Sequence, residues 1–334
     1  MKRFFEFGNR LHSGETSIPF VGKGKLWLSI ATVLVILSLL IPVVGGFNLG
    51  IAFRGGSEFE ISNVKSNDPQ PGIDATNKTV NNAEATGVPR SDTSVRVETR
   101  QLSDDEMQKV REALVKAYSV ENKDVTSNFV GPLWGQDITN KMARALVIFV
   151  VISMIVMALY FRTWKMSLAA IAGLFFVMIT TMGIYSASGF EVTPEAVIGF
   201  LTVLSFSLYD TVVVFDKIRE NTADFQKNRK QTFGELVNLG VNQTTVRSIN
   251  TTVISILPIA SILFIGVFML GAGTLVDIAL SLFVGTITAA ASTLFVASPL
   301  YYFLRKNEPV VREQEKTVLE ARASKKSAEP VAAK

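Results

Sequence analysis

Long apolar runs, interrupted by polar and charged segments, form the main pattern along the chain. A helix of about 20 mainly apolar residues crosses the roughly 30 Å hydrocarbon core of a membrane. We therefore predict six membrane-spanning helices, at residues 26–46, 143–161, 167–188, 196–216, 247–270 and 275–304. The fold class that follows is an α-helical polytopic membrane protein.

The segment 47–142 follows the first span and is predicted to form a small α+β domain outside the membrane. Alternating apolar and polar residues predict strands at 50–61 and 94–99, and we expect a last strand at 125–130. Ser103 and Glu106 have the spacing of a capping box, which predicts the start of a helix. We expect one helix to lie across a small sheet.

Two segments contain too few bulky apolar residues to bury a core of their own. Residues 66–90 carry prolines and glycines among Asn, Thr and Ala, and we predict a flexible insert there. The tail, residues 305–334, is charged and rich in alanine. We predict that this tail is disordered.

Lys and Arg residues gather on one side of the predicted spans. Five lie in the N-terminal segment 1–25 and eight in the tail 305–334, and the loop 217–246 is also basic. The short loops 189–195 and 271–274 contain none. Because cytoplasmic loops carry the excess of Lys and Arg, both termini are predicted to be cytoplasmic and the α+β domain extracytoplasmic.

The composition removes several classes of function. The chain has no cysteine and a single histidine, His12. Disulfides, thiolate catalysis and cysteine metal sites are therefore excluded, and a histidine-based metal centre is not expected. No G-x-x-x-x-G-K-[ST] phosphate-binding loop occurs in the sequence. We predict no enzyme, no bound cofactor and no metal.

The segment 205–221 carries the main candidate for chemistry, because Asp210 interrupts an apolar run there. An ionised carboxylate inside a membrane costs a few kcal/mol, and such residues mark proton or ion routes. Ser207 and Thr211 supply hydroxyl groups beside it. The alternatives are a buried structural aspartate bonded to a neighbouring helix, or an aspartate close enough to the cytoplasmic boundary to be hydrated.

Arg247 enters the fifth span within a polar segment and shares a helix face with Asn250 and Thr251. Both Asp210 and Arg247 lie toward the cytoplasmic half, so a contact between the two helices is a reasonable hypothesis. Protonation of Asp210 that releases Arg247 would form a charge switch. The alternative is a permanent salt bridge that only holds the helices together.

The chain resembles the SecF family of protein-export membrane subunits in four stretches. They are SLYDTVVVFDKIREN (207–221), FRGGSEFEI (53–61), RSINTT (247–252) and FVASPL (295–300). Three residues depart from the usual pattern of the family: Tyr209 where Asn is frequent, Lys217 where Arg is usual, and Ala52 where Asp is common.

The resemblance implies that Asp210 and Arg247 belong to a proton-conducting element, with Asp216 and Arg219 as helix-end residues. It implies a plasma (inner) membrane protein that uses the proton motive force to promote export of unfolded polypeptides, after or alongside ATP-driven translocation. The implied partners are SecD, the SecYEG translocon and the translocating preprotein. A YidC-type insertase and anionic lipid are further candidates, no nucleic acid is expected, and sodium is an alternative to protons.

Two other functions remain open from the sequence. The first is one half of a proton-driven small-molecule exporter of the resistance-nodulation-division class, which shares this membrane architecture. Those exporters contain two membrane halves and large porter domains, whereas this chain has one set of six spans. The second is a non-conducting assembly subunit in which Asp210 is structural.

Overall fold

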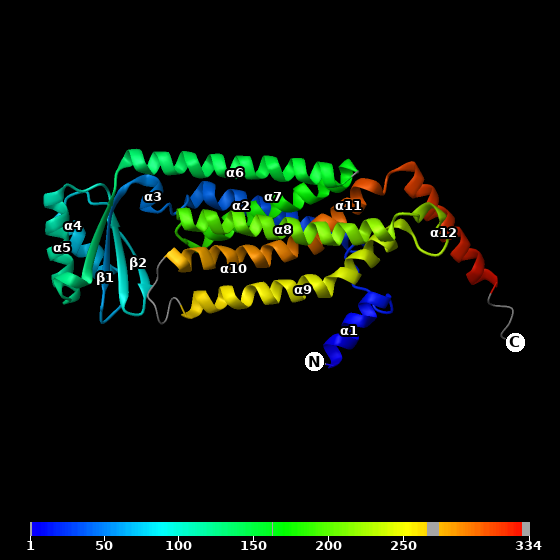
Figure 1. The fold of residues 1–334 in the computed structure, drawn as a ribbon, viewed down its shortest axis with the longest axis horizontal. Coiled ribbons are helices and arrows are strands. Elements are labelled where there is room, and N and C mark those ends of the chain that lie inside the picture. Colours follow the sequence, from blue (N-terminus) through cyan, green and yellow to red (C-terminus); the bar gives the residue numbers. More distant parts are fainter. Residues whose placement is uncertain (1, 162, 266–273, 329–334) are drawn as a thin grey trace.

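The computed structural model describes residues 2–161, 163–265 and 274–328. The end of the predicted fifth span, 266–270, and the end of the tail, 329–334, lie outside the described residues. The molecule is elongated, with a bundle of long helices along its length and a small domain containing a sheet at one end (Figure 1). The first and last described helices, α1 (Lys2–Ser13) and α12 (Pro309–Ala328), lie toward the other end, which we call the terminal end (Figure 1).

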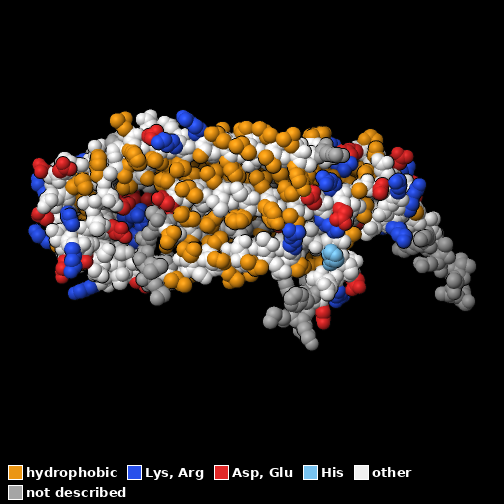
Figure 2. All heavy atoms as spheres, viewed as in Figure 1, with side chains coloured by type: hydrophobic (Ala, Val, Ile, Leu, Met, Phe, Trp, Pro, Cys, Tyr) orange, Lys and Arg blue, Asp and Glu red, His pale blue; other side chains and the backbone are white. Residues whose placement is uncertain are grey.

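Among the described residues, six helices are long and apolar enough to cross a membrane, which confirms the predicted fold class. They form the membrane domain and are α2 (Gly24–Gly45), α6 (Pro132–Tyr160), α7 (Trp164–Ser188), α8 (Pro194–Asn221), α9 (Phe233–Ile265) and α10 (Thr274–Ser292), the last continuing through a π-helical turn (Thr293–Ala297) into α11 (Ser298–Arg305). On the face shown in Figure 2, hydrophobic side chains cover the middle of the molecule and charged side chains gather toward its two ends. This distribution suits a protein that spans a bilayer.

The sheet domain, residues 51–131, has a β-α-β-β-α-β chain order after a short helix. Its elements are α3 (Ile51–Arg54), β1 (Gly56–Ser62), α4 (Gln70–Thr79), β2 (Thr86–Ser91), β3 (Ser94–Thr99), α5 (Asp104–Tyr118), a 3-10 turn (Asn122–Asp124) and β4 (Val125–Val130). The strand order is β2-β3-β1-β4, and all neighbouring strands are antiparallel. This is a ferredoxin-like arrangement.

The alternation of the strands directs their apolar side chains to the face covered by α4 and α5. The buried core includes Phe59, Ile61, Val95, Val97, Val110, Leu114 and Val125. The predicted capping box is confirmed, because Ser103 accepts a hydrogen bond from the backbone N–H of Glu106, whose side chain accepts one from the N–H of Ser103. The domain therefore has its own hydrophobic core at the end of the membrane domain.

The prediction of a flexible insert at 66–90 is wrong, because this segment contains α4 and the edge strand β2. Helix α4 packs on α5 through small residues, which the composition argument had treated as unable to form a core. Gly72 lies against Tyr118, whose hydroxyl accepts from the Gly72 N–H at 3.1 Å and donates to the Asp68 carbonyl at 2.9 Å. Close approach here needs a residue without a side chain.

The predicted disordered tail is also corrected in its described part, which forms α12 (Pro309–Ala328). Val311 and Val318 are one heptad apart and are fully buried, so a sparse apolar stripe is sufficient to dock the helix. Arg322 forms an ion pair with Glu235 at 2.7 Å. The predicted loop 217–246 is mostly helical as well, since α8 and α9 extend into it around a short 3-10 turn (Phe225–Lys227).

Helices α8 and α10 form a close pair in the membrane domain. Gly199 of α8 lies against Ser281 of α10, and Gly285 of α10 lies against Val203 of α8. Small residues at such positions let helix backbones approach within a membrane. In the most apolar stretches of α7 and of α10 with its continuation, about half of the residues are buried, whereas few are buried in those of α2, α6 and α9, as expected for helices that face lipid.

Candidate ion-coupling site

Helix α8 carries Asp210 and begins with a well-formed N-terminus. The hydroxyl of Thr193 accepts a hydrogen bond from the Ala196 N–H at 3.1 Å, and Pro194 occupies the first helical position. The helix then continues to Asn221 without interruption. Its start lies beside the sheet domain, so α8 connects that end of the molecule with the level of Asp210.

Asp210 is partly buried and turned toward α9. Its Oδ1 accepts a hydrogen bond from Ser248 Oγ at 2.7 Å. Its Oδ2 is buried and has no hydrogen-bond partner among the described residues. An unpaired polar atom in a low-dielectric interior is costly, and the oxygen is therefore available to a proton or a cation.

Arg247 does not pair with Asp210 as the sequence hypothesis proposed. Its Nη2 donates to the Tyr209 hydroxyl at 3.4 Å, and its side chain is exposed. Ser248, the next residue of α9, occupies the position toward Asp210. Successive residues of a helix point about 100° apart, so Arg247 reaches the exposed Tyr209 of α8 while Ser248 contacts Asp210.

The four predicted supporting residues divide into two groups. Ser207 and Thr211 are buried on α8, and Thr211 Oγ1 lies 3.2 Å from Thr293 Oγ1 on the facing helix. Asn250 and Thr251 are exposed on α9 and take no part in the hydrogen bonds of Asp210. The structure thus brings together the hydroxyl groups of α8, α9 and the π-helical turn.

The predicted helix-end residues lie near the end of α8. Asp216 and Arg219 approach to 3.8 Å within that helix. The Tyr160 hydroxyl at the end of α6 donates to Asp216 Oδ2. Asp216 therefore ties α6 to α8 at the terminal end of the membrane domain.

The π-helical turn Thr293–Ala297 overlaps the FVASPL stretch and faces the Asp210 site through Thr293. Ser298 Oγ donates to the Thr293 carbonyl at 2.8 Å, and Ser292 Oγ donates to the Gly173 carbonyl of α7 at 2.8 Å. Such turns are frequent at functional sites. Hydrophobic periodicity could not indicate it, because the run 275–304 is apolar on most faces and has no stripe whose direction an extra residue would shift.

Sequence reasoning missed a second polar site where the sheet domain meets the membrane domain. Arg90 of β2 pairs with Asp277 of α10 at 3.2 Å, and Arg96 of β3 pairs with Glu191 of the α7–α8 loop at 3.2 Å. The sequence feature that could have indicated this site was the pair Glu191 and Glu195 in a loop without Lys or Arg. No group of three or more metal-ligating side chains was found in the described part of the chain.

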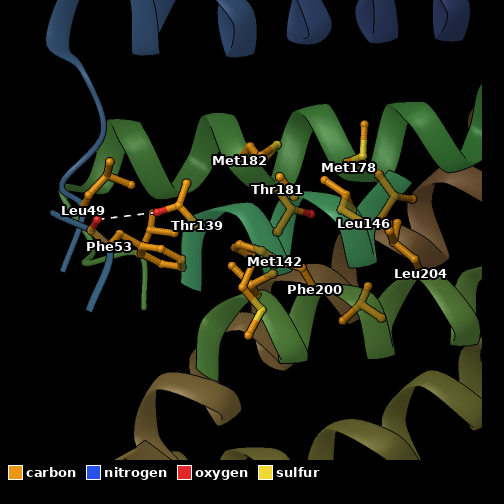
Figure 3. Close-up of a pocket in the computed structure, with 15 residues that line it drawn as sticks. Leu49, Phe53, Thr139, Met142, Leu146, Met178, Thr181, Met182, Phe200 and Leu204 are labelled. Atoms are coloured by element: carbon orange, nitrogen blue, oxygen red, sulfur yellow. Dashed lines mark hydrogen bonds between the residues drawn. The ribbon is translucent and has the colours of Figure 1, made fainter. Parts of the chain in front are cut away.

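An apolar cavity of about 210 Å³ lies between α6, α7 and α8 near the sheet domain (Figure 3). Leu49, Met142, Met178 and Leu204 are among the side chains that line it (Figure 3). No ionisable side chain lines this cavity. The cavity is therefore chemically different from the site around Asp210.

These features define a multi-pass membrane protein in which a ferredoxin-like domain follows the first span and a carboxylate joins two membrane helices. The family model described as "Protein export membrane protein SecD/SecF, C-terminal" matches residues 110–307. The chain therefore belongs to the SecD/SecF family of protein-export membrane proteins.

Curated relatives agree with the family model and confirm the resemblance to SecF. The chain is 40% identical over 324 residues to "Protein translocase subunit SecF" of Streptomyces coelicolor, covering 97% of this chain and 86% of the relative. It is 37% identical to the protein of the same name from Mycobacterium leprae, covering 96% of this chain and 72% of the relative.

A solved structure described as SecDF, a translocon-associated membrane protein from Thermus thermophilus, has the same fold. It superimposes with a TM-score of 0.75 and 25% sequence identity, over 87% of this chain and 39% of that chain. SecDF in a super-membrane-facing form superimposes with a TM-score of 0.62, over 92% of this chain and 40% of that chain. The present chain thus spans about two fifths of the solved SecDF chains.

Proposed function

We propose that this chain is a SecF-type subunit that works beside SecD and the SecYEG translocon, and that it uses the proton motive force to promote export of unfolded polypeptides. It acts after or alongside ATP-driven translocation and catalyses no chemical reaction itself. The observation that carries the proposal is the buried, unpaired Oδ2 of Asp210 on a helix that begins at the sheet domain. Family membership and the SecDF structures support the assignment of partners.

In the proposed orientation the terminal end is cytoplasmic and the sheet domain lies outside the membrane. The basic residues of 1–25 and 305–334 support this choice. A cavity of about 860 Å³ at the terminal end is lined by Lys25 and Lys306, among others, which supports anionic lipid headgroups as a further partner; Arg322 in the same lining is paired with Glu235. A YidC-type insertase remains a candidate partner.

The energy available from the gradient is large enough for the proposed role. Moving one charge through 100 mV is worth about 2.3 kcal/mol. Typical coupling free energies between two sites are about 1–3 kcal/mol. One proton at Asp210 can therefore bias two arrangements of α8 and α9. Sodium is the alternative ion, because a carboxylate with neighbouring hydroxyl oxygens offers it suitable ligands.

The test is export into inverted membrane vesicles with and without a proton gradient, with the wild type and Asp210→Asn at matched protein levels. The variant keeps the shape of the side chain and removes its charge. We expect it to lose the gradient-dependent part of export and to keep the ATP-dependent part. Asp224→Asn, in an exposed turn, is the matched control and should behave as the wild type.

If Asp210→Asn retained the full response to the gradient, the carboxylate would be structural and the proposed role would be wrong. A sodium gradient that replaced the proton gradient in the wild type would identify sodium as the coupling ion. Export of a small molecule in place of polypeptide would favour the exporter function. The names of the curated relatives favour the translocase function over that alternative.

A further inference from the structure

The sheet domain is held to the membrane domain by a layer of buried ion pairs. Arg90 Nη1 lies 3.2 Å from Asp277 Oδ1, and both side chains are nearly buried. Arg96 reaches Glu191 Oε2 at 3.2 Å through Nη1 and Glu58 Oε2 at 3.2 Å through Nε. The contact between the two domains therefore depends on charged groups that water scarcely reaches.

Backbone contacts fix the loop that carries Glu191. Leu49 and Val192 form a parallel bridge, and the Val192 N–H donates to the Asn48 carbonyl at 2.7 Å. The Gly50 N–H donates to the Val192 carbonyl at 3.0 Å. A side chain at position 50 would collide with the Glu191 carboxylate, so Gly50 lets that carboxylate reach the sheet.

Carboxylates outnumber guanidinium groups in this layer. Its arginines are Arg54, Arg90 and Arg96, and its acidic residues are Glu58, Glu98, Glu191 and Asp277, with Glu195 lining the same cavity. A buried charge without a partner is strongly unfavourable. At least one carboxylate in the layer is therefore left without a full positive partner when all of them are ionised.

Glu98 is the carboxylate that the arrangement leaves short of partners. It lies directly opposite Glu58 in the register of β3 and β1, and like charges at such positions repel. Its Oε2 accepts from Arg54 Nη2 at 2.6 Å, but its Oε1 is buried without a hydrogen-bond partner, 3.9 Å from Arg96 Nη1. Its side chain is 6% exposed, and Glu191 faces it from the α7–α8 loop.

We propose that Glu98 and Glu191 together form a proton-binding site, and that the bound proton holds the sheet domain against the ends of α7, α8 and α10. With the proton present, the two carboxyl groups share a hydrogen bond and the charge of the layer is balanced. Without it, two carboxylates repel each other across the domain boundary, and separation of the domains allows water to solvate both.

The electrostatics of the site agree with this arrangement. Burial, followed by the neighbouring charge of Glu191, raises the pKa of Glu98 to about 7, although Arg54 acts in the opposite direction. Burial also raises the pKa of Glu58, against the opposing effect of Arg96. Glu98 in the separated domain is hydrated and returns toward its ordinary value of 4.5.

The sign of the pH dependence follows from linkage. Because docking raises the pKa of Glu98, the docked form binds the proton more tightly than the separated form. The stabilisation of docking is complete below about pH 4.5 and is lost as the pH rises through about 7. One proton changes the docking equilibrium by up to about tenfold per pH unit within that window.

The proton site stands on the geometry of the domain boundary and does not rest on the proposed export function. In the proposed orientation, the site faces the acidic side of the membrane. In that orientation, the proton gradient favours the docked form of the sheet domain, and a local rise in pH favours the separated form. The site is distinct from Asp210, which lies on the other side of the small-residue contacts of α8 and α10.

The test is the distance between the two domains as a function of pH. The chain has no cysteine, so spin labels can be placed on single introduced cysteines at the exposed positions Lys123 and Ala187. The full chain is reconstituted in liposomes, and double electron–electron resonance is recorded from about pH 5 to about pH 9, across the window set by linkage. We expect a single label-to-label distance in acid. Above about pH 7 a second, longer distance should appear, and the fraction of molecules that show it should increase with pH.

Three variants decide the outcome. Glu98→Gln, which is neutral at every pH, should keep the short distance throughout. Glu191→Gln, which removes the repelling neighbour, should move the midpoint to lower pH. Glu112→Gln, on the exposed face of α5, is the control and should titrate as the wild type. The proposal is overturned if the wild type shows one distance at all pH values, or if either site variant titrates with the wild-type midpoint.

Discussion

Substitution of Gly285 by alanine is expected to separate α8 from α10 and to weaken the site around Asp210. A Cβ atom at position 285 would lie 2.7 Å from both methyl carbons of Val203. Carbon atoms pack best at about 3.5–4.0 Å, so the helices must move apart by about 1 Å. Overpacking of this kind costs about 1–3 kcal/mol.

The same displacement reaches the hydroxyl contact beside Asp210. Thr211 Oγ1 and Thr293 Oγ1 are 3.2 Å apart across these two helices. A hydrogen bond is effectively lost beyond about 3.5 Å, so a shift of about 1 Å breaks it. We therefore expect Gly285→Ala to lower the unfolding temperature in detergent and to reduce the gradient-dependent part of export.

A second substitution tests the cause. Val203→Ala removes the two methyl groups that collide with the new Cβ, so the double variant should recover stability that each single variant lacks. Gly45→Ala is the matched control, because a Cβ at that helical position meets no atom within 4 Å. Wild-type stability and export in Gly285→Ala, or no recovery in the double variant, would refute the packing argument.

The remaining predictions concern the sheet domain. Ser103→Ala removes the N-cap of α5 and should speed amide exchange in the first turn of that helix, which corresponds to a loss of about 1 kcal/mol of local stability. Unchanged exchange at Glu106 would contradict the role of the cap. Leu114→Ala removes a fully buried core side chain and should destabilise the domain by about 2–5 kcal/mol in exchange measurements on the full chain. The membrane helices should keep their protection from amide exchange in this variant. An equal loss of protection in both domains would show that the hydrophobic core of the sheet domain is not independent of the membrane domain.

The fold was predictable wherever the apolar pattern was strong. Six long runs gave six spans, and the strand expected at 125–130 forms β4 with the same bounds. The errors came from segments with few bulky residues. Helix α4 packs through Gly72 and Thr76, and α12 docks through two valines, so a count of large apolar side chains underestimated both. Close backbone approach provides contacts that composition does not measure.

The candidate site was predictable in part, for a geometric reason. A lone carboxylate in an apolar run identified Asp210, because few residue types are so unfavourable in a membrane. Its partner could not be identified, since neighbouring residues of α9 differ by about 100° in direction and the rotation of that helix is set by packing. The charges at the domain boundary come from β1, β2, β3, a loop and α10, and only the folded chain brings them together.

The layer of ion pairs and the site around Asp210 are connected by the same pair of helices, because α8 carries Glu195 and Asp210, and α10 carries Asp277 and continues to Thr293. Along α8, Glu195 and Asp210 are separated by about 22 Å, and along α10 and its π-helical turn, Asp277 and Thr293 are separated by about 24 Å, at the rise of an α-helix. Gly285 and Val203 lock the two helices between these levels. A movement of α10 that releases Asp277 from Arg90 is therefore transmitted along this packed pair toward the level of Asp210 and Thr293. Because coupling between two binding sites is reciprocal, any factor by which protonation of Glu98 changed the proposed ion affinity of Asp210 would equal the factor by which an ion at Asp210 changed docking of the sheet domain.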